Sequence, residues 1–214
     1  LTFDENVVAG SGNVTLKKSS DNSTVEAMDV GGANVSISGA AVTVNPTADL
    51  DSSEGYYLQI AATAFDDASG NSYAGINDTT TLSFTAADVV GPTMAITSTT
   101  SGVSSGSTTN DSTINLTFTA NEAATGFDAN DITVAGGSVS SFATVSSTVY
   151  TATFTPSGAG ATTVDVAGSK FTDAAGNNNS AATQFTWTYD NVAPTMAITS
   201  TTSGVSLSLI HISE

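Results

Sequence analysis

The heptapeptide Thr113-Ile-Asn-Leu-Thr-Phe-Thr119 alternates polar and apolar residues at every position. In an extended chain successive side chains point to opposite faces, so Ile114, Leu116 and Phe118 share one face and the polar residues share the other. This is the pattern of a half-buried strand in an antiparallel sheet. The heptapeptide therefore predicts a strand with one face in a core and the other in water.

The same alternation recurs along the whole chain. Apolar residues with a period of two form these groups: Val14/Leu16, Val35/Ile37, Val42/Val44, Tyr56/Leu58/Ile60, Leu82/Phe84, Tyr150/Ala152/Phe154 and Phe185/Trp187/Tyr189. Shorter strands are expected around 132–134, 139–142 and 163–166. Clusters of Gly, Asn and Asp separate the groups at the spacing of a β-sandwich, and no segment has sustained helical periodicity. The sequence predicts an all-β fold of antiparallel β-sandwiches.

A second pattern repeats at the scale of a domain. The stretch Pro92-Thr-Met-Ala-Ile-Thr-Ser-Thr-Thr-Ser-Gly-Val-Ser104 returns unchanged as Pro194–Ser206, an offset of 102 residues (194 − 92). This offset is about the length of one sandwich domain of ~100 residues. Such self-similarity is typical of tandem arrays, whose modules usually serve as spacers or binding surfaces.

The joints of the array are expected at two matching segments, Asp88-Val-Val-Gly-Pro92 and Asp190-Asn-Val-Ala-Pro194, because each proline favours an extended residue before it. Residues 207–214 depart abruptly from the earlier copy and resemble translated sequencing-adapter read-through, which predicts a non-native tail. The expected divisions are a first domain at 1–89, a second at 90–191, the first strand of a third at 192–206 and the tail at 207–214.

The first domain is expected to lack its opening strand. Leu1-Thr-Phe3 matches Leu116-Thr-Phe118, which lies 24 residues (116 − 92) into its own repeat. The match predicts an exposed sheet edge beside the first residues of the chain.

Composition excludes several classes of function. Three Lys and Arg residues against 20 Asp and Glu give a net charge of −17, which leaves no basic surface for nucleic acid or anionic lipid. One-signed charge repels itself at low ionic strength, which favours salty or calcium-containing surroundings outside the cell. The absence of cysteine excludes disulfides and thiolate chemistry. No apolar run reaches the ~20 residues of a membrane helix, so no membrane insertion is expected in this segment.

The second repeat resembles bacterial immunoglobulin-like domains, which occur in tandem in surface adhesins and other large secreted proteins. The residues that carry the resemblance are Leu116–Val134, Gly136-Gly137, Tyr150–Pro156 and Phe171-Thr-Asp-Ala-Ala-Gly-Asn177. The first domain is similar to the related domain of S-layer and surface proteins, through Leu1–Val7, Tyr56–Ile60 and Asp67–Asn71. The resemblance implies immunoglobulin-like β-sandwiches that act as stalk or adhesive modules, and it implies no enzymatic activity.

Two Asp-Ala-x-Gly-Asn loops, Asp67–Asn71 and Asp173–Asn177, admit two interpretations. Asp can accept backbone N–H bonds and Gly can adopt a positive φ, so the simpler interpretation is a turn without an ion. The alternative is calcium, which takes six to eight oxygen ligands and would stiffen a loop or a joint between domains. The candidate calcium ligands are Glu122, Asp128, Asp131 and Asp173, with Asp88 and Asp190 at the joints.

Other constellations have simpler explanations. Asp49–Gly55 resembles an EF-hand loop only superficially, because Glu54 occupies the position that needs glycine. The one histidine, His211, lies in the predicted tail, so no Ser-His-Asp triad or histidine-ligated zinc is expected. Trp187, with neighbours at alternate positions, could stack on a sugar, but three large apolar side chains on one strand face more often fill a core.

These observations lead to an expected function without catalysis. We expect spacer or stalk modules of a large secreted or cell-surface bacterial protein, with neighbouring repeats of the same chain as partners. Two alternatives stay open. One is an adhesive module that binds a cell-surface glycan or protein, and the other is an accessory module of a secreted polysaccharide-degrading enzyme.

Overall fold

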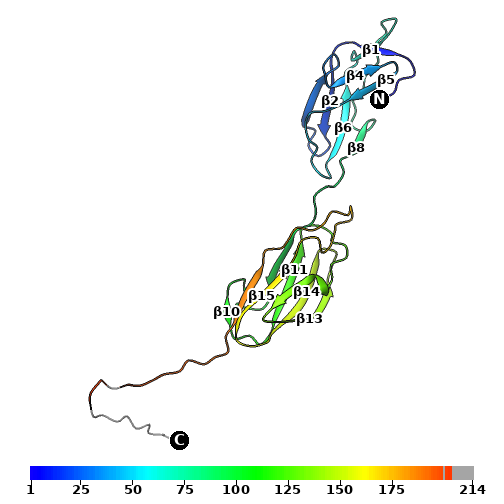
Figure 1. Cartoon of the computed structure of the whole chain (residues 1–214). Helices are drawn as coiled ribbons and strands as arrows, with labels where there is room; N and C mark the ends of the chain where they lie inside the picture. The colour runs from blue at the N-terminus through cyan, green and yellow to red at the C-terminus, as the bar shows by residue number, and fades with distance from the viewer. Residues whose placement is uncertain (200, 204–214) are drawn as a thin grey trace. The chain divides into compact units, whose positions relative to one another are not determined.

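The computed structural model describes residues 1–199 and 201–203, and it divides the chain into two compact units (Figure 1). Unit 1 is Leu1–Val90 and unit 2 is Gly91–Glu214. This division lies within the first predicted joint. The predicted tail lies outside the described residues.

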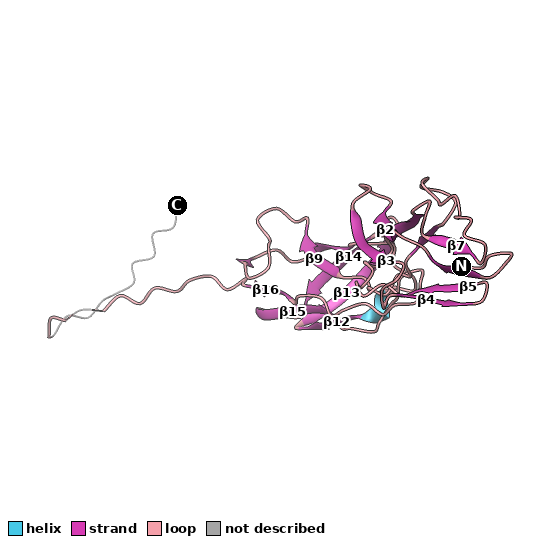
Figure 2. Ribbon diagram, turned by 90° about the horizontal axis from the view of Figure 1, so that it is seen from above, coloured by secondary structure: helices cyan, strands magenta, loops and turns pink. Residues whose placement is uncertain are grey.

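Unit 2 consists of two four-stranded sheets. One has the order β13-β14-β11-β9 and is antiparallel throughout, with β9 (Met94–Ser98), β11 (Ile114–Ala120), β13 (Gly137–Thr144) and β14 (Val149–Pro156). The other has the order β10-β16-β15-β12, with β10 (Thr108–Thr109), β12 (Ile132–Ala135), β15 (Gly160–Val166) and β16 (Phe185–Tyr189). Its β10–β16 pair is parallel. Among the described residues the only helix is a short 3₁₀ turn, Ala129–Asp131 (Figure 2).

Both sheets of unit 2 contribute to one core. Ile114, Leu116 and Phe118 are buried, as their alternation predicts, and Phe154 and Trp187 join them. The Trp187 indole is 1% exposed, its ring lies edge-on to that of Phe154, and its Nε1–H donates to Thr109 Oγ1 at 3.1 Å. The core interpretation of Trp187 is confirmed.

Unit 1 repeats the all-β pattern with shorter strands. They are β1 (Val7–Ala9), β2 (Asn13–Lys18), β3 (Thr24–Asp29), β4 (Val35–Ser38), β5 (Ala41–Val44), β6 (Gly55–Ile60), β7 (Phe65–Asp67) and β8 (Ser83–Thr85). One sheet has the order β3-β2-β6-β8, and the pairs β4-β5 and β1-β7 complete the unit. Its core shares no residue with that of unit 2 and includes Val14, Leu16, Tyr56, Ile60 and Phe65.

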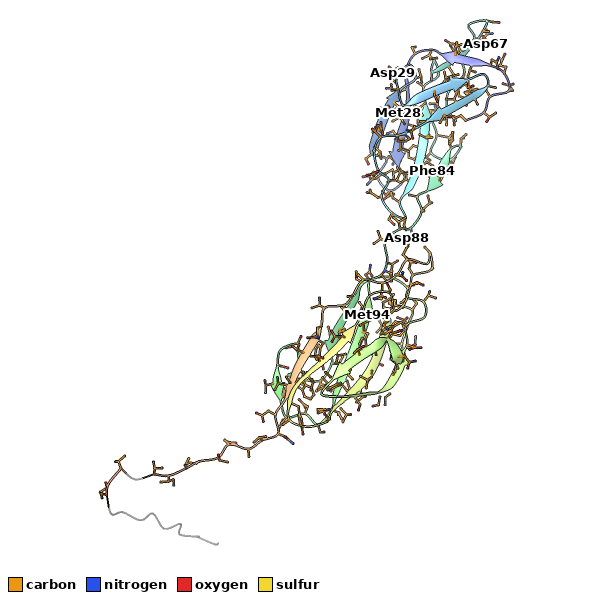
Figure 3. All side chains as sticks on the ribbon, viewed as in Figure 1. Met28, Asp29, Asp67, Phe84, Asp88 and Met94 are labelled. Carbon is orange, nitrogen blue, oxygen red and sulfur yellow. The ribbon has the colours of Figure 1, made fainter. Side chains whose placement is uncertain are left out.

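The strand that contains Phe84 lies at the edge of its sheet. Phe84 is 40% exposed, and its ring stacks on Tyr56 with the centroids 5.7 Å apart (Figure 3). Leu82 lies before β8 and packs against the core. Phe84 lies opposite Tyr56 in the β6–β8 pair, so Leu82 and Phe84 both lie on the core side, as their alternation predicts, and Phe84 stays partly exposed on the edge strand.

Glu26 ties β3 to the loop after β5. Its Oε2 accepts the amides of Thr47 at 2.8 Å and Ala48 at 3.1 Å, and its Oε1 accepts Thr47 Oγ1 and Asn34 Nδ2, both at 2.9 Å. The bond from the Ala48 amide, followed by those from Thr47 and Asn34, holds the pKa of Glu26 below its ordinary value despite the opposing effect of burial. The carboxylate thus stabilises unit 1 in its charged form.

Glu26→Gln is therefore expected to lower the melting temperature of unit 1 at pH 7 and to have little effect in acid. A group with a lowered pKa stabilises the fold fully above its unfolded value, near 4.5, and that stability is lost as the pH falls through the native pKa. Melting curves from pH 7 to pH 2 test this, with Glu5→Gln at an exposed position as the control. An equal loss at pH 7 and pH 2 would contradict the role of the charge.

Candidate functional site

The first Asp-Ala-x-Gly-Asn loop is a closed turn. Asp67 Oδ1 accepts the amides of Ser69 and Asn71, both at 2.8 Å, and Asn71 Nδ2 donates to Asp67 Oδ2 at 2.7 Å. Gly70 has a φ of 85°, a conformation that side-chain-bearing residues rarely adopt. The predicted turn is present, and the loop itself supplies hydrogen bonds to both carboxylate oxygens of Asp67.

The second loop has the same geometry in unit 2. Asn177 donates its amide to Asp173 Oδ1 at 2.9 Å and its Nδ2 to Oδ2 at 2.8 Å, and Gly176 has a φ of 92°. Asp173 is only 4% exposed. Burial opposes its charge, but the hydrogen bonds from Asn177 and the following loop amides leave the pKa of Asp173 below its ordinary value. A buried carboxylate that stays ionised is the most distinctive acidic group of unit 2.

The core fixes the position of this loop. Phe171, two residues before Asp173, is buried, and its ring lies 5.2 Å from that of Phe127. Thr172 forms isolated bridges with Thr125 and Asn178. The loop is therefore anchored on both sides of its aspartate.

Three of the six candidate calcium ligands come together. Asp88, Glu122 and Asp173 each offer a carboxylate oxygen, and these oxygens all lie within 4.8 Å of one another. Glu122 follows β11, and Asp88 lies in the segment before β9 (Figure 3). Like charges at this separation repel, and a divalent cation would offset that repulsion.

The other three candidates lie outside this group and accept hydrogen bonds within their own turns. Asp128 Oδ1 accepts the Asn130 amide at 2.7 Å and Asp131 Oδ2 accepts the Asp128 amide at 2.9 Å, which makes a capping box for the 3₁₀ turn. Asp190 Oδ1 accepts the Val192 amide at 3.0 Å. The spacing of two acids in the sequence does not show whether they cap a turn, as Asp128 and Asp131 do, or bind a metal ion.

The ligand atoms of the three clustered acids are all carboxylate oxygens, and this determines which metal ions they could bind. Carboxylate oxygens are hard ligands, which favour Ca²⁺, Mg²⁺ or Mn²⁺ over metals that prefer nitrogen and sulfur ligands. Three oxygens are fewer than the six to eight of a calcium ion, so backbone carbonyls or water would have to supply the rest.

The arrangement of each unit, two layers of mainly antiparallel strands around its own core, is that of an immunoglobulin-like β-sandwich. Family models described as bacterial Ig-like domain match residues 1–86 and 88–189. The chain carries two bacterial Ig-like domains in tandem. The second match begins at Asp88, so it contains all three clustered acids, whereas the compact units divide two residues later.

Bacterial Ig-like domains are common on surface and secreted proteins. No curated protein matches the chain. Among the described residues no helix has the length and apolar character required to cross a membrane.

Proposed function

We propose that the two domains are non-catalytic spacer modules of a large secreted or cell-surface bacterial protein of the adhesin type. The observation that carries this proposal is that each domain closes its own core, with no residue shared between the two. A module that is stable by itself can be added in tandem without redesign of its neighbours. The unchanged return of Pro92–Ser104 as Pro194–Ser206 supports such an array.

The surface composition supports a role as a spacer. The 20 acids against three bases keep the modules mutually repulsive, which opposes collapse of an array onto itself. The polar faces of β11 and β14 carry Thr residues and Asn115. The extracellular or cell-surface location belongs to the same proposal.

The two alternatives have less support. A glycan-binding module normally presents an aromatic platform, and Trp187 is in the core. The spacer therefore remains the function that the described residues support best.

The spacer proposal is tested by pulling a single chain between its ends. We expect two separate unfolding events, each of which releases roughly 30 nm of chain because about 90 residues extend by ~3.4 Å each. A glycan array with the same fragment provides the second arm. Specific glycan binding, or a single unfolding event, would count against the proposal.

Calcium at Asp88, Glu122 and Asp173 stays a prediction. We expect one Ca²⁺ per chain by isothermal titration and a higher melting temperature of unit 2 with calcium than with chelator. A ligand that binds only the folded state stabilises it by about 2.7 kcal/mol at a hundredfold excess over its Kd.

The variant Glu122→Gln is expected to weaken the binding, because it removes one charged ligand from the group. Asp190→Asn is the matched control, since Asp190 lies outside the group. Absence of both binding heat and a melting shift in the unmodified chain would end the calcium hypothesis.

A further inference from the structure

Unit 2 has one long strand at the edge of a sheet. β13 is the first strand of the order β13-β14-β11-β9, so within the part of the chain that the structure describes it pairs with β14 alone (Figure 1). It has eight residues, whereas the other edge strands of unit 2, which are β9, β10 and β12, have five, two and four. The unpaired backbone groups of a long edge strand can bind a strand of another molecule.

The side chains of β13 do not protect this edge. Lysine and proline are the residues that most often keep an edge strand from pairing with another molecule. The sequence Gly137-Ser-Val-Ser-Ser-Phe-Ala-Thr144 contains neither, and it has no charged residue of any kind. Short segments with little charge and no proline are also those that pair readily with their own copies. Any protection of this edge must therefore come from the backbone.

A β-bulge interrupts the strand near its middle. The register of β13 on β14 shifts between Ser140 and Ala143. Across this shift Ser141 and Phe142 share the one position opposite Ala152. A bulge bends its strand, increases the local twist and disrupts the ladder of hydrogen bonds. The long edge is thereby divided into two short ones, at residues 137–140 and 143–144.

Ser141 adopts an unfavourable conformation to form this bulge. Its φ is 53°, in the left-handed region that favours glycine. Residues with a side chain are destabilising in this region, and they persist there only where the surrounding structure imposes the conformation. A regular strand would avoid this cost.

The core does not need the extra residue. Phe142 packs against the core, and its ring lies 5.7 Å from that of Phe127 and 6.0 Å from that of Tyr150. Without Ser141, Phe142 would lie opposite the buried Ala152 by itself, and residues directly opposite each other share a face. The pairs on both sides of the bulge would keep their partners. The bulge therefore serves a purpose other than the packing of Phe142.

We propose that the bulge at Ser141 and Phe142 prevents the β13 edges of two copies of this module from pairing with each other. The partner that it excludes is a second β13, antiparallel to the first, because a two-fold axis brings the same edge of two copies together. Without the bulge, β13 would be a regular strand of seven residues (8 − 1) centred on Ser140. This inference goes beyond the spacer role, and it explains how similar modules stay separate when many are close together.

Deletion of Ser141 tests the inference. We expect the variant to keep the fluorescence of the buried Trp187 and to self-associate at concentrations at least about tenfold lower than the unmodified chain does. Sedimentation of both chains at about 0.15 M salt measures the association, because repulsion between acidic copies is screened there beyond about 8 Å. Ser141→Gly is the matched control. It keeps the bulge and relieves the strain, so it should raise the melting temperature of unit 2 and sediment as the unmodified chain does.

Two lysine variants show whether β13 is the surface that associates. In the deletion variant Ser140 is the central residue of the strand, so in a two-fold pair it lies opposite its own copy. Ser140→Lys in this background should restore the sedimentation of the unmodified chain, because like charges directly opposite each other destabilise a strand pair. Thr119→Lys in the same background should not, since Thr119 is an exposed residue of the interior strand β11.

Three results would overturn the inference. The first is a deletion variant that sediments as the unmodified chain does. The second is a deletion variant that does not fold, because the core would then require the bulge. The third is association that Ser140→Lys does not reverse, or that both lysine variants reverse equally.

Discussion

Phe118→Ala is expected to lower the free energy of unfolding of unit 2 by about 3–5 kcal/mol and to leave the unfolding of unit 1 unchanged. The Phe118 side chain is fully buried between the two sheets, with its ring 5.8 Å from that of Phe127. Its removal costs the transfer energy of the ring and leaves a cavity in a core that unit 1 does not share. Denaturant unfolding of the two-domain chain, followed by Trp187 fluorescence for unit 2, measures the effect.

Phe84→Ala is the matched control for this prediction. The Phe84 ring is 40% exposed and stacks on one neighbour in unit 1, so its loss should cost much less. Equal destabilisation of both units by Phe118→Ala would contradict the independence of the two cores, and with it the spacer proposal.

Asn179→Ala should destabilise unit 2 by roughly 3–5 kcal/mol, since a buried group left unpaired costs about 1–3 kcal/mol and several are lost together. Asn179 is buried, and its Oδ1 accepts the amides of Lys170 and Phe171 at 2.7 and 3.0 Å. Its Nδ2 donates to the carbonyls of Ala167 and Ser180 at 2.9 and 2.8 Å. One side chain thus satisfies four backbone groups on both sides of the Asp173 loop.

Thermal and denaturant melts of Asn179→Ala and Asn178→Ala test this role side by side. The neighbouring Asn178 is exposed, so its replacement should change stability by no more than about 0.5 kcal/mol. Similar effects of the two variants would show that the Asn179 bonds contribute little.

The alternation of apolar residues was sufficient to predict the longest strands of unit 2. Ile114 to Phe118 and Tyr150 to Phe154 have one buried face each, and nothing local competes with that pattern. The strands β1, β7 and β10 escaped prediction, because two or three residues carry no measurable period, and β3 escaped it because its burial does not alternate. Their pairing is set by the strands beside them.

The sequence predicted which residue types form the candidate site, but not which of the six candidate acids come together. Asp173 and Asn177 repeat the spacing of Asp67 and Asn71, so the sequence shows both turns. Asp173 is buried and Asp67 is not, because Asp173 lies beside the buried Phe171. A local sequence pattern does not show this packing. The role of Asn179 was missed for the same reason, since its four partners are backbone groups whose positions only the fold defines.

The parallel pair β10–β16 has a mechanical consequence. It joins a strand near the beginning of unit 2 to its last strand, and it is reinforced by bonds from Gly106 to Thr186, from Thr188 to Ser107 and from Asp190 to Thr109. Tension between the two ends slides these strands lengthwise past each other, so the bonds between them bear the load at once and cannot open one after another like a zipper. Under tension this seam would bear its load in shear once β9, which precedes β10 in the chain, has separated from β11.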